Sequence, residues 1–118
     1  MKINPNSGIL FTGTNRALLR KIDTDFYTGK FLRREDRSVE HILPRSKGGK
    51  NDVFNITVTD KRINTERGNM DLARWFRIHP EYAEGAHQFI CKYWDAPIQG
   101  VKYGQAILKT ITRMGVSI

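Results

Sequence analysis

Cysteine is nearly absent from this sequence of 118 residues, in which Cys91 is the only one. A single cysteine excludes a disulfide within the chain and a structural zinc site built from cysteine pairs. Long apolar runs are missing as well: no stretch of about 18 apolar residues occurs, so no membrane-spanning helix is expected. The segment MKINPNSGILF contains no apolar core of signal-peptide length. These absences predict a protein of the reducing cytoplasm, with no membrane association and no structural zinc.

Acidic residues are few compared with basic ones. Lys and Arg number 20 against 12 Asp and Glu, which gives a formal net charge of +8 and a pI near 9.9. Small domains this basic usually bind a polyanion, either a nucleic acid or a membrane surface. Charge alone leaves a basic protein without such a partner as an alternative. With 39% hydrophobic residues and a mean hydropathy of -0.51, the chain is expected to form one domain over residues 1–118 with a modest core.

The first two thirds of the chain alternate short elements with turn residues. A helix is expected over residues 15–22. The aromatic pair Phe26-Tyr27 stands before a Thr-Gly turn, which predicts a hairpin. Two strands are expected in SVEHIL and FNITVT, separated by the Gly- and Pro-rich loop PRSKGGKND. The segment DKRINTER then predicts a helix that Thr59 or Asp60 caps and the following glycine ends.

The last third of the chain has a helical pattern. Helices are expected over residues 71–78, from Pro80 to about residue 94, and near 99–113, because apolar residues recur there every three or four positions. The aromatic stripe of the middle helix, which ends with Trp94, is expected to belong to the core. Cys91 lies beside this stripe and is expected to be buried at least in part.

Four polar residues stand out on the strand–loop–strand–helix unit between residues 39 and 68. They are Glu40, His41, Asn55 and Asn64, and their spacing is regular: Asn55 follows His41 by 14 positions, and Asn64 follows Asn55 by 9. Each residue alone has an ordinary structural explanation, such as a strand end, a turn or a solvated helix position. Their joint occurrence around a Gly-Gly loop favours a functional site.

This pattern resembles the HNH endonuclease family. The likeness covers residues 26–70; VEHILPRSKGG is close to the first family signature, and the downstream Asn-(8 residues)-Asn followed by Gly is similar to the second. Many members have histidine at the position of Asn64. The asparagine variant resembles the HNH domains of RNA-guided CRISPR nucleases and of some phage nucleases. The resemblance implies an α+β fold with a ββα-metal centre, and residues 71–118 would add packed helices. Helical packing and the Phe26-Tyr27 hairpin would replace the zinc-binding cysteine pairs of other members.

The residue types suggest how such a site would work. His41 has an ordinary pKa near neutrality and is therefore the expected general base. One of its ring nitrogens is expected to be held by a backbone carbonyl across the hairpin. Glu40 and Asn64 offer hard oxygen ligands, which favour Mg²⁺, with Mn²⁺ able to substitute. By resemblance, Asn55 organises the hairpin and so belongs to the catalytic set with His41.

Basic residues surround this unit and are expected to contact phosphates. Phosphate contacts supply affinity without reading sequence. Arg67 lies one helical turn beyond Asn64 and is expected to reach the scissile phosphate. The expected nucleic-acid contacts are Arg45, Lys47, Lys50, Lys61, Arg62 and Arg67.

The sequence thus predicts a metal-dependent DNA endonuclease that nicks one strand per active site. The likeness to small phage and mobile-element proteins places it in the cytoplasm of a bacterium or a phage-infected host. Two alternatives remain open: a nucleic-acid-binding protein without activity on an HNH scaffold, and a structure-selective or RNA-directed nuclease with the same site. A protein partner or a homodimer is also left open.

Overall fold

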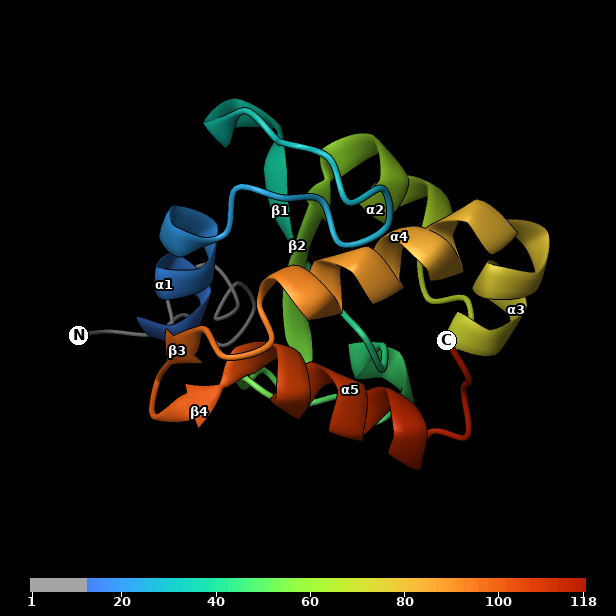
Figure 1. Ribbon diagram of the computed structural model, residues 1–118. Helices are drawn as coiled ribbons and strands as arrows, with labels where there is room; N and C mark the ends of the chain where they lie inside the picture. The colour runs from blue at the N-terminus through green and yellow to red at the C-terminus, as the bar shows by residue number, and fades with distance from the viewer. Residues whose placement is uncertain (1–12) are drawn as a thin grey trace.

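The computed structural model describes residues 13–118, which form an α+β fold of five helices and two small antiparallel sheets (Figure 1). The predictions for residues 1–12 lie outside this range. The helices are α1 Gly13–Lys21, α2 Lys61–Arg67, α3 Leu72–Ile78, α4 Pro80–Lys92 and α5 Tyr103–Arg113. The strands are β1 Arg37–His41, β2 Ile56–Asp60, β3 Pro97–Ile98 and β4 Val101–Lys102, and single 3₁₀ turns span Arg34–Asp36 and Arg45–Lys47.

The central sheet is the hairpin of β1 and β2, and it has the predicted order of strand, loop, strand and helix. Arg37 pairs with Asp60 at one end of the hairpin, and His41 pairs with Ile56 at the other. Four of the five residues of β2 are buried, whereas β1 buries only Val39 and Glu40. The register places the end of β1 opposite the start of β2, so the irregular segment 44–55 projects from that end.

Helix α2 follows β2 directly, and its ends carry the predicted signals. The Asp60 side chain accepts a hydrogen bond from the backbone N–H of Arg62, which satisfies one of the free donors at the helix start. Gly68 ends the helix with a φ of 55°, a conformation that disfavours residues with a Cβ. These two signals fix which residues of α2 face the sheet.

The turn at residues 24–31 packs beneath the hairpin and is held by a buried carboxylate. Its ends form one antiparallel bridge between Thr24 and Phe31, so the predicted hairpin is reduced to a turn. Asp25 accepts hydrogen bonds from the backbone N–H of Tyr27 at 2.8 Å and from the hydroxyl of Thr59 at 2.9 Å. Asp25 therefore ties this turn to β2 and positions Tyr27 for the site.

Helices α3, α4 and α5 complete the core around the hairpin (Figure 1). Helix α4 approaches the turn closely at Gly85, where a Cβ would lie 1.9 Å from the carbonyl oxygen of Tyr27. Helix α5 approaches α4 in the same way at Gly104, 2.5 Å from the carbonyl oxygen of Ile90. Within the described range, no helix has the length and apolar character that crossing a bilayer requires.

Three sequence predictions about the last third were wrong. The helix expected from residue 99 begins at Tyr103, because residues 97–102 form the small hairpin of β3 and β4 with positive φ at Gln99 and Gly100. Cys91 is exposed rather than buried. Trp94, expected in the core, is 40% exposed because α4 ends at Lys92, before this residue.

Candidate functional site

The four residues singled out in the sequence all lie on the β1–β2–α2 unit. Glu40 and His41 close β1, Asn55 immediately precedes β2, and Asn64 lies in the middle of α2. The backbone N–H of Ile42 donates to the carbonyl of Asn55 at 2.8 Å, so the two strands stay joined one residue beyond the ladder. The site is thus built where the hairpin opens into the loop.

Asn55 braces that loop through three hydrogen bonds. Its side-chain oxygen accepts the backbone N–H of Leu43 at 2.8 Å, and its amide nitrogen donates to the carbonyls of Leu43 at 3.0 Å and Lys50 at 2.8 Å. One buried side chain therefore satisfies backbone groups on both arms of the loop. This geometry supports the organising role that the resemblance implies for Asn55.

A glycine makes this bracing possible. A Cβ on Gly49 would lie 1.7 Å from the carbonyl oxygen of Leu43 and 2.9 Å from the amide nitrogen of Asn55. No side chain can be placed there without moving backbone. The second glycine of the Gly-Gly loop is therefore required by the close approach of the loop to its own brace.

Glu40 lies in the interface between β1 and α2 and is only 3% exposed. Its Oε2 accepts hydrogen bonds from the Tyr27 hydroxyl at 2.7 Å and from Nη1 of Arg67 at 3.2 Å. Its Oε1 accepts the backbone N–H of His41 at 3.1 Å. The carboxylate is therefore one half of a buried ion pair, with a phenol as a third member.

Burial and charge act against each other in this cluster. Burial raises the pKa of Glu40, whereas the positive charge of Arg67 and the hydroxyl of Tyr27 lower it, and the net direction is upward. Burial, followed by the negative charge of Glu40, raises the pKa of Tyr27 well above its usual value. The phenol consequently remains a proton donor to the carboxylate throughout the physiological range.

Arg67 corrects one prediction made from the sequence. It was expected to contact phosphate, but its side chain is buried and its nitrogens are used inside the protein. Besides Glu40 and Tyr27, the guanidinium donates to the carbonyls of His41 at 2.7 Å, Ile42 at 2.9 Å and Met70 at 3.0 Å. A side chain so engaged holds the end of β1 onto α2, and its burial keeps it from contacting DNA.

Asn64 faces the same interface one helical turn before Arg67. Its amide nitrogen donates to the carbonyl of Val39 at 2.9 Å and to the hydroxyl of Ser38 at 3.1 Å. Among the described residues, no hydrogen bond reaches its Oδ1. The amide is therefore oriented by β1, and this orientation directs its oxygen away from the strand.

The donors expected to bind a metal are a carboxylate oxygen on β1 and an amide oxygen on α2. Glu40 Oε1 accepts a single hydrogen bond and keeps a second lone pair, and Asn64 Oδ1 is left without a donor. These atoms fit Mg²⁺, which accepts few protein ligands and keeps several waters. Residues 13–118 contain no group of three His, Cys, Asp or Glu side chains that could form a denser site.

His41 is half-buried at the mouth of the loop. Burial lowers its pKa from the usual 6.5, the positive charges of Arg45 and Arg67 lower it further, and an interaction with the Asn51 side chain raises it. Its Nε2 is inaccessible to solvent and has no hydrogen bond of normal geometry, so the backbone carbonyl expected to hold it is not found within the described part of the chain. The neutral imidazole is thus the favoured form at neutral pH.

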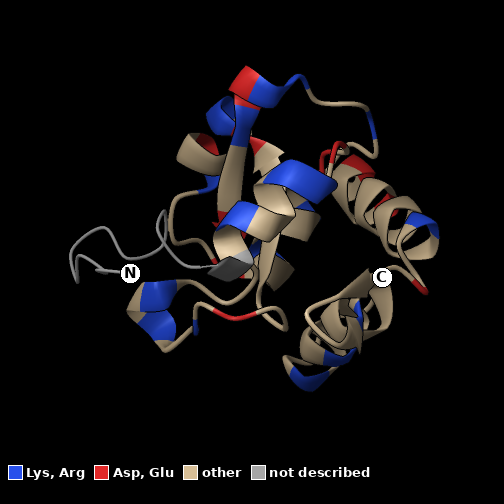
Figure 2. Ribbon diagram, turned by 90° about the vertical axis from the view of Figure 1, so that its left-hand side faces the viewer, with Lys and Arg blue, Asp and Glu red and all other residues tan. Residues whose placement is uncertain are grey.

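Basic side chains lie at the surface in several regions. Five of the six predicted phosphate contacts are exposed, and one of them, Lys47, forms an ion pair with Asp71. One such region lies on α1 and the turn before β1, where Figure 2 shows basic positions in blue. It surrounds a pocket of about 380 Å³. Its lining residues are Arg16, Leu19, Arg20, Arg34 and Arg37. Arg37 is anchored there by hydrogen bonds to the carbonyls of Leu19 and Leu32.

The sequence reasoning missed two residues of the site. Tyr27 was read only as part of a hairpin, and its bond to Glu40 spans 13 positions with no local signal. Asn51 was read as loop, although its side chain interacts with His41. An asparagine inside a loop that follows a candidate base is a signal that could have found the second residue. Comparison with known proteins found no matching family model and no matching curated protein.

Proposed function

We propose that this protein is a metal-dependent endonuclease with a ββα-metal centre, which hydrolyses DNA phosphodiester bonds and cuts one strand per active site. The cytoplasm of a bacterium or a phage-infected host is its proposed location. The supporting observation is the loop braced by Asn55, which holds His41 next to a helix-borne amide and a buried carboxylate. A histidine whose pKa is lowered by burial and nearby charge, beside such a loop, is a candidate functional residue.

His41 acts as the general base in this proposal. Since Nε2 faces the protein, Nδ1 accepts the proton from a water molecule while that water attacks the phosphorus. The P–O3′ bond breaks, and the leaving oxygen takes a proton from solvent, so a 5′-phosphate and a 3′-hydroxyl result. The lowered pKa keeps the acceptor nitrogen free of a proton at neutral pH.

Glu40 and Asn64 would hold the metal through Oε1 and Oδ1. A bound Mg²⁺ would supply charge stabilisation for the phosphate and the leaving oxygen. The chain itself orients both ligands, because the Tyr27 hydroxyl and the Arg67 guanidinium fix the carboxylate while Val39 and Ser38 fix the amide. Arg67 also neutralises part of the ligand charge, which predicts weak metal binding.

Cleavage of supercoiled plasmid tests the proposal. Purified protein with Mg²⁺ or Mn²⁺ should produce open-circular plasmid before linear plasmid, and EDTA should abolish the reaction. His41→Ala should lose at least about 100-fold in rate, the usual worth of a general base. His87→Ala, which removes an exposed histidine of α4, is the matched control and should cut normally. Equal activity of the two variants would contradict the assignment of His41.

The Glu40–Arg67 pair also favours a second candidate, a nucleic-acid-binding protein that does not cut. A carboxylate whose Oε2 is shared by a guanidinium and a phenol is already compensated, as in a purely structural ion pair. Binding of labelled DNA without cleavage in either metal would establish this candidate. A structure-selective nuclease would instead cut branched DNA or RNA while sparing plasmid.

A further inference from the structure

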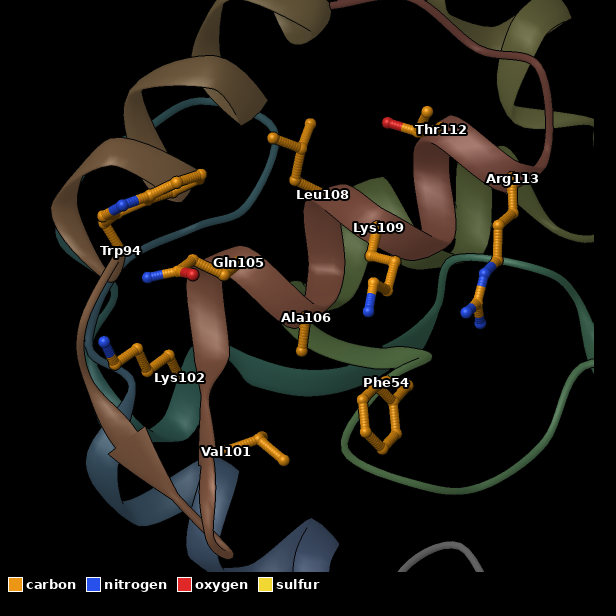
Figure 3. A pocket seen from close by; sticks show the side chains of 10 residues that line it. All are labelled: Phe54, Trp94, Val101, Lys102, Gln105, Ala106, Leu108, Lys109, Thr112 and Arg113. Atoms are coloured by element: carbon orange, nitrogen blue, oxygen red, sulfur yellow. The ribbon is translucent and has the colours of Figure 1, made fainter.

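A groove of about 600 Å³ runs along α5 beside the loop that carries Asn55 (Figure 3). Its apolar lining includes Phe54, Trp94 and Val101, and its basic lining includes Lys102, Lys109 and Arg113. The groove lies outside the set of residues that the proposed chemistry uses. A ligand that fills this groove must match both linings.

Two large aromatic side chains of this groove are left in contact with solvent. Phe54 is 42% exposed and Trp94 is 40% exposed. Among the described residues, only Phe31 and Ile78 are other large apolar side chains with comparable exposure, and neither lines the groove. Exposed aromatic faces gathered at one hollow indicate a ligand with apolar or aromatic surface.

Basic side chains flank these rings, and few of their charges are paired with an acidic side chain. Lys109 and Arg113 lie one turn apart on α5 and extend toward the side where Phe54 lies (Figure 3). The ion pairs of the described residues include neither of them. Lys102 has only a loose, exposed contact of 3.8 Å with Asp95. The ligand should therefore carry negative charge at intervals along its length.

We propose that this groove binds an unpaired stretch of DNA, with a base stacked on Phe54 and phosphates next to Lys109 and Arg113. Single-stranded nucleic acid combines flat aromatic faces with a phosphate at every step, and proteins bind it with exposed aromatics inside basic grooves. In a duplex the base faces are covered by their neighbours, so a ring such as Phe54 would have nothing to stack on. The net charge of +8 favours the same polyanionic ligand.

The position of Phe54 connects this groove to the candidate site. The hydroxyl of Thr110 donates to the carbonyl of Phe54 at 2.6 Å, which fastens the loop to α5. Phe54 precedes Ile56 by two residues, and Ile56 is the register partner of His41. Strand geometry then limits the Cα–Cα distance between Phe54 and His41 to about 12 Å. If the proposed function holds, the preferred substrate has an unpaired segment next to the scissile phosphate.

Fluorescence anisotropy in EDTA tests binding apart from cleavage. The full chain is titrated into a fluorescein-labelled oligothymidylate of about twelve nucleotides and into a blunt duplex of equal length. Phe54→Ala should weaken binding of the oligothymidylate roughly 5- to 100-fold and leave duplex binding unchanged. Phe31→Ala, which removes a ring that is 70% exposed elsewhere, is the matched control and should behave like the wild type.

A second variant and a cleavage assay complete the test. Lys109→Gln/Arg113→Gln should also weaken oligothymidylate binding more than duplex binding. The inference would be overturned if a groove variant weakened oligothymidylate and duplex binding equally, or if Phe54→Ala and Phe31→Ala bound the oligothymidylate alike. A peptide that binds more tightly and displaces the oligothymidylate would also overturn it. Groove-dependent binding without plasmid nicking would support the inference while the proposed activity fails. Groove variants that bind the oligothymidylate as tightly as the wild type and also nick plasmid at the wild-type rate would overturn the inference and support the proposed activity.

Discussion

At the scale of single residues, the site depends on how each polar side chain is compensated. Glu40 is buried and still has a partner for each oxygen, whereas Nε2 of His41 is buried with no normal partner among residues 13–118. Compensation makes Glu40 part of the fold, whereas burial and then the positive charge of Arg45 lower the pKa of His41. The two neighbours on β1 are therefore expected to respond differently to pH and to substitution.

The lowered pKa of His41 predicts activity that extends into mildly acidic solution. The base must be neutral, so the rate should fall only when the pH drops below the usual histidine value of 6.5, through the lower pKa of the folded protein. Stability should fall in the same window, because the unfolded chain takes up the proton first. Initial nicking rates measured from about pH 5 to about pH 8 would show this acid limb.

A charge change at Arg45 tests whether this acid limb belongs to His41. The positive charge of Arg45 is the largest cause of the lowered pKa after burial, so Arg45→Glu should move the acid limb to higher pH. Arg77→Glu, at an exposed position of α3, makes the same change of charge away from the histidine and should leave the limb in place. A wild-type limb at or above the usual histidine value would contradict the assignment of His41 as the base.

Removing Arg67 should be strongly destabilising. Arg67→Ala would leave the Glu40 carboxylate buried without its counter-charge and would free the carbonyls of His41 and Ile42, a loss of about 3–5 kcal/mol in the free energy of unfolding. Arg67→Lys keeps the charge but loses the forked geometry, so its loss should be smaller. Urea unfolding measures both, with Arg77→Ala as the exposed control.

The Arg67→Ala variant can also test whether Glu40 binds Mg²⁺. If Glu40 is a metal ligand, Mg²⁺ should raise the unfolding midpoint of Arg67→Ala more than that of the wild type, since the cation replaces the missing charge. An equal response of both proteins to Mg²⁺ would argue that Glu40 serves only in the ion pair. The identity of this partner was beyond sequence reasoning, because Arg67 lies 27 positions from Glu40 and was expected at the surface.

At the scale of elements, the loop between β1 and β2 is a unit with one brace. Asn55→Ala would leave the backbone groups of Leu43 and Lys50 without partners, and each unsatisfied buried group costs about 1–3 kcal/mol. Asn55→Asp keeps the bond from the Leu43 N–H but places a carboxylate oxygen against the carbonyls of Leu43 and Lys50, so its loss should be at least as large. Nicking should fall in both variants, because the loop holds His41.

The matched control for this brace is Asn69→Ala. That asparagine is exposed and makes only a marginal contact of 3.5 Å with Ser46. Its loss should change neither the urea midpoint nor the nicking rate. Gly49→Ala, which places a Cβ 1.7 Å from a backbone oxygen, should instead reproduce the loss seen in Asn55→Ala. Normal activity of both loop variants would contradict the organising role of Asn55.

Elements were predictable where the signal is local. The Asp60 cap, the glycine after α2 and the run of β-branched residues in β2 act within a few positions, and the order of β1, β2 and α2 follows from them. The hairpin at residues 97–102 was missed because its turn depends on positive φ at Gln99, a conformation rare for a residue with a side chain. Trp94 was misplaced because periodicity does not show where a helix ends.

At the scale of the whole molecule, positive charge is spread over more than one surface. Exposed basic residues surround the loop, line the groove on α5 and form the arginine pocket beside α1. The sequence predicted the first group because it adjoins the motif. The pocket depends on the packing of α1 against β1, which joins residues about 20 positions apart, so the sequence alone did not bring them together.

The arginine pocket should add to the salt dependence of DNA binding. Each phosphate contact contributes a slope of about -0.9 to the plot of log binding constant against log salt concentration for duplex DNA. Arg20→Gln/Arg34→Gln should therefore reduce the magnitude of the slope by about 2 in anisotropy titrations of a duplex in EDTA. Lys30→Gln/Arg77→Gln removes the same charge at exposed positions outside the pocket and serves as the control. Because general charge loss affects both pairs alike, an equal slope for the two would show that the pocket makes no specific phosphate contact.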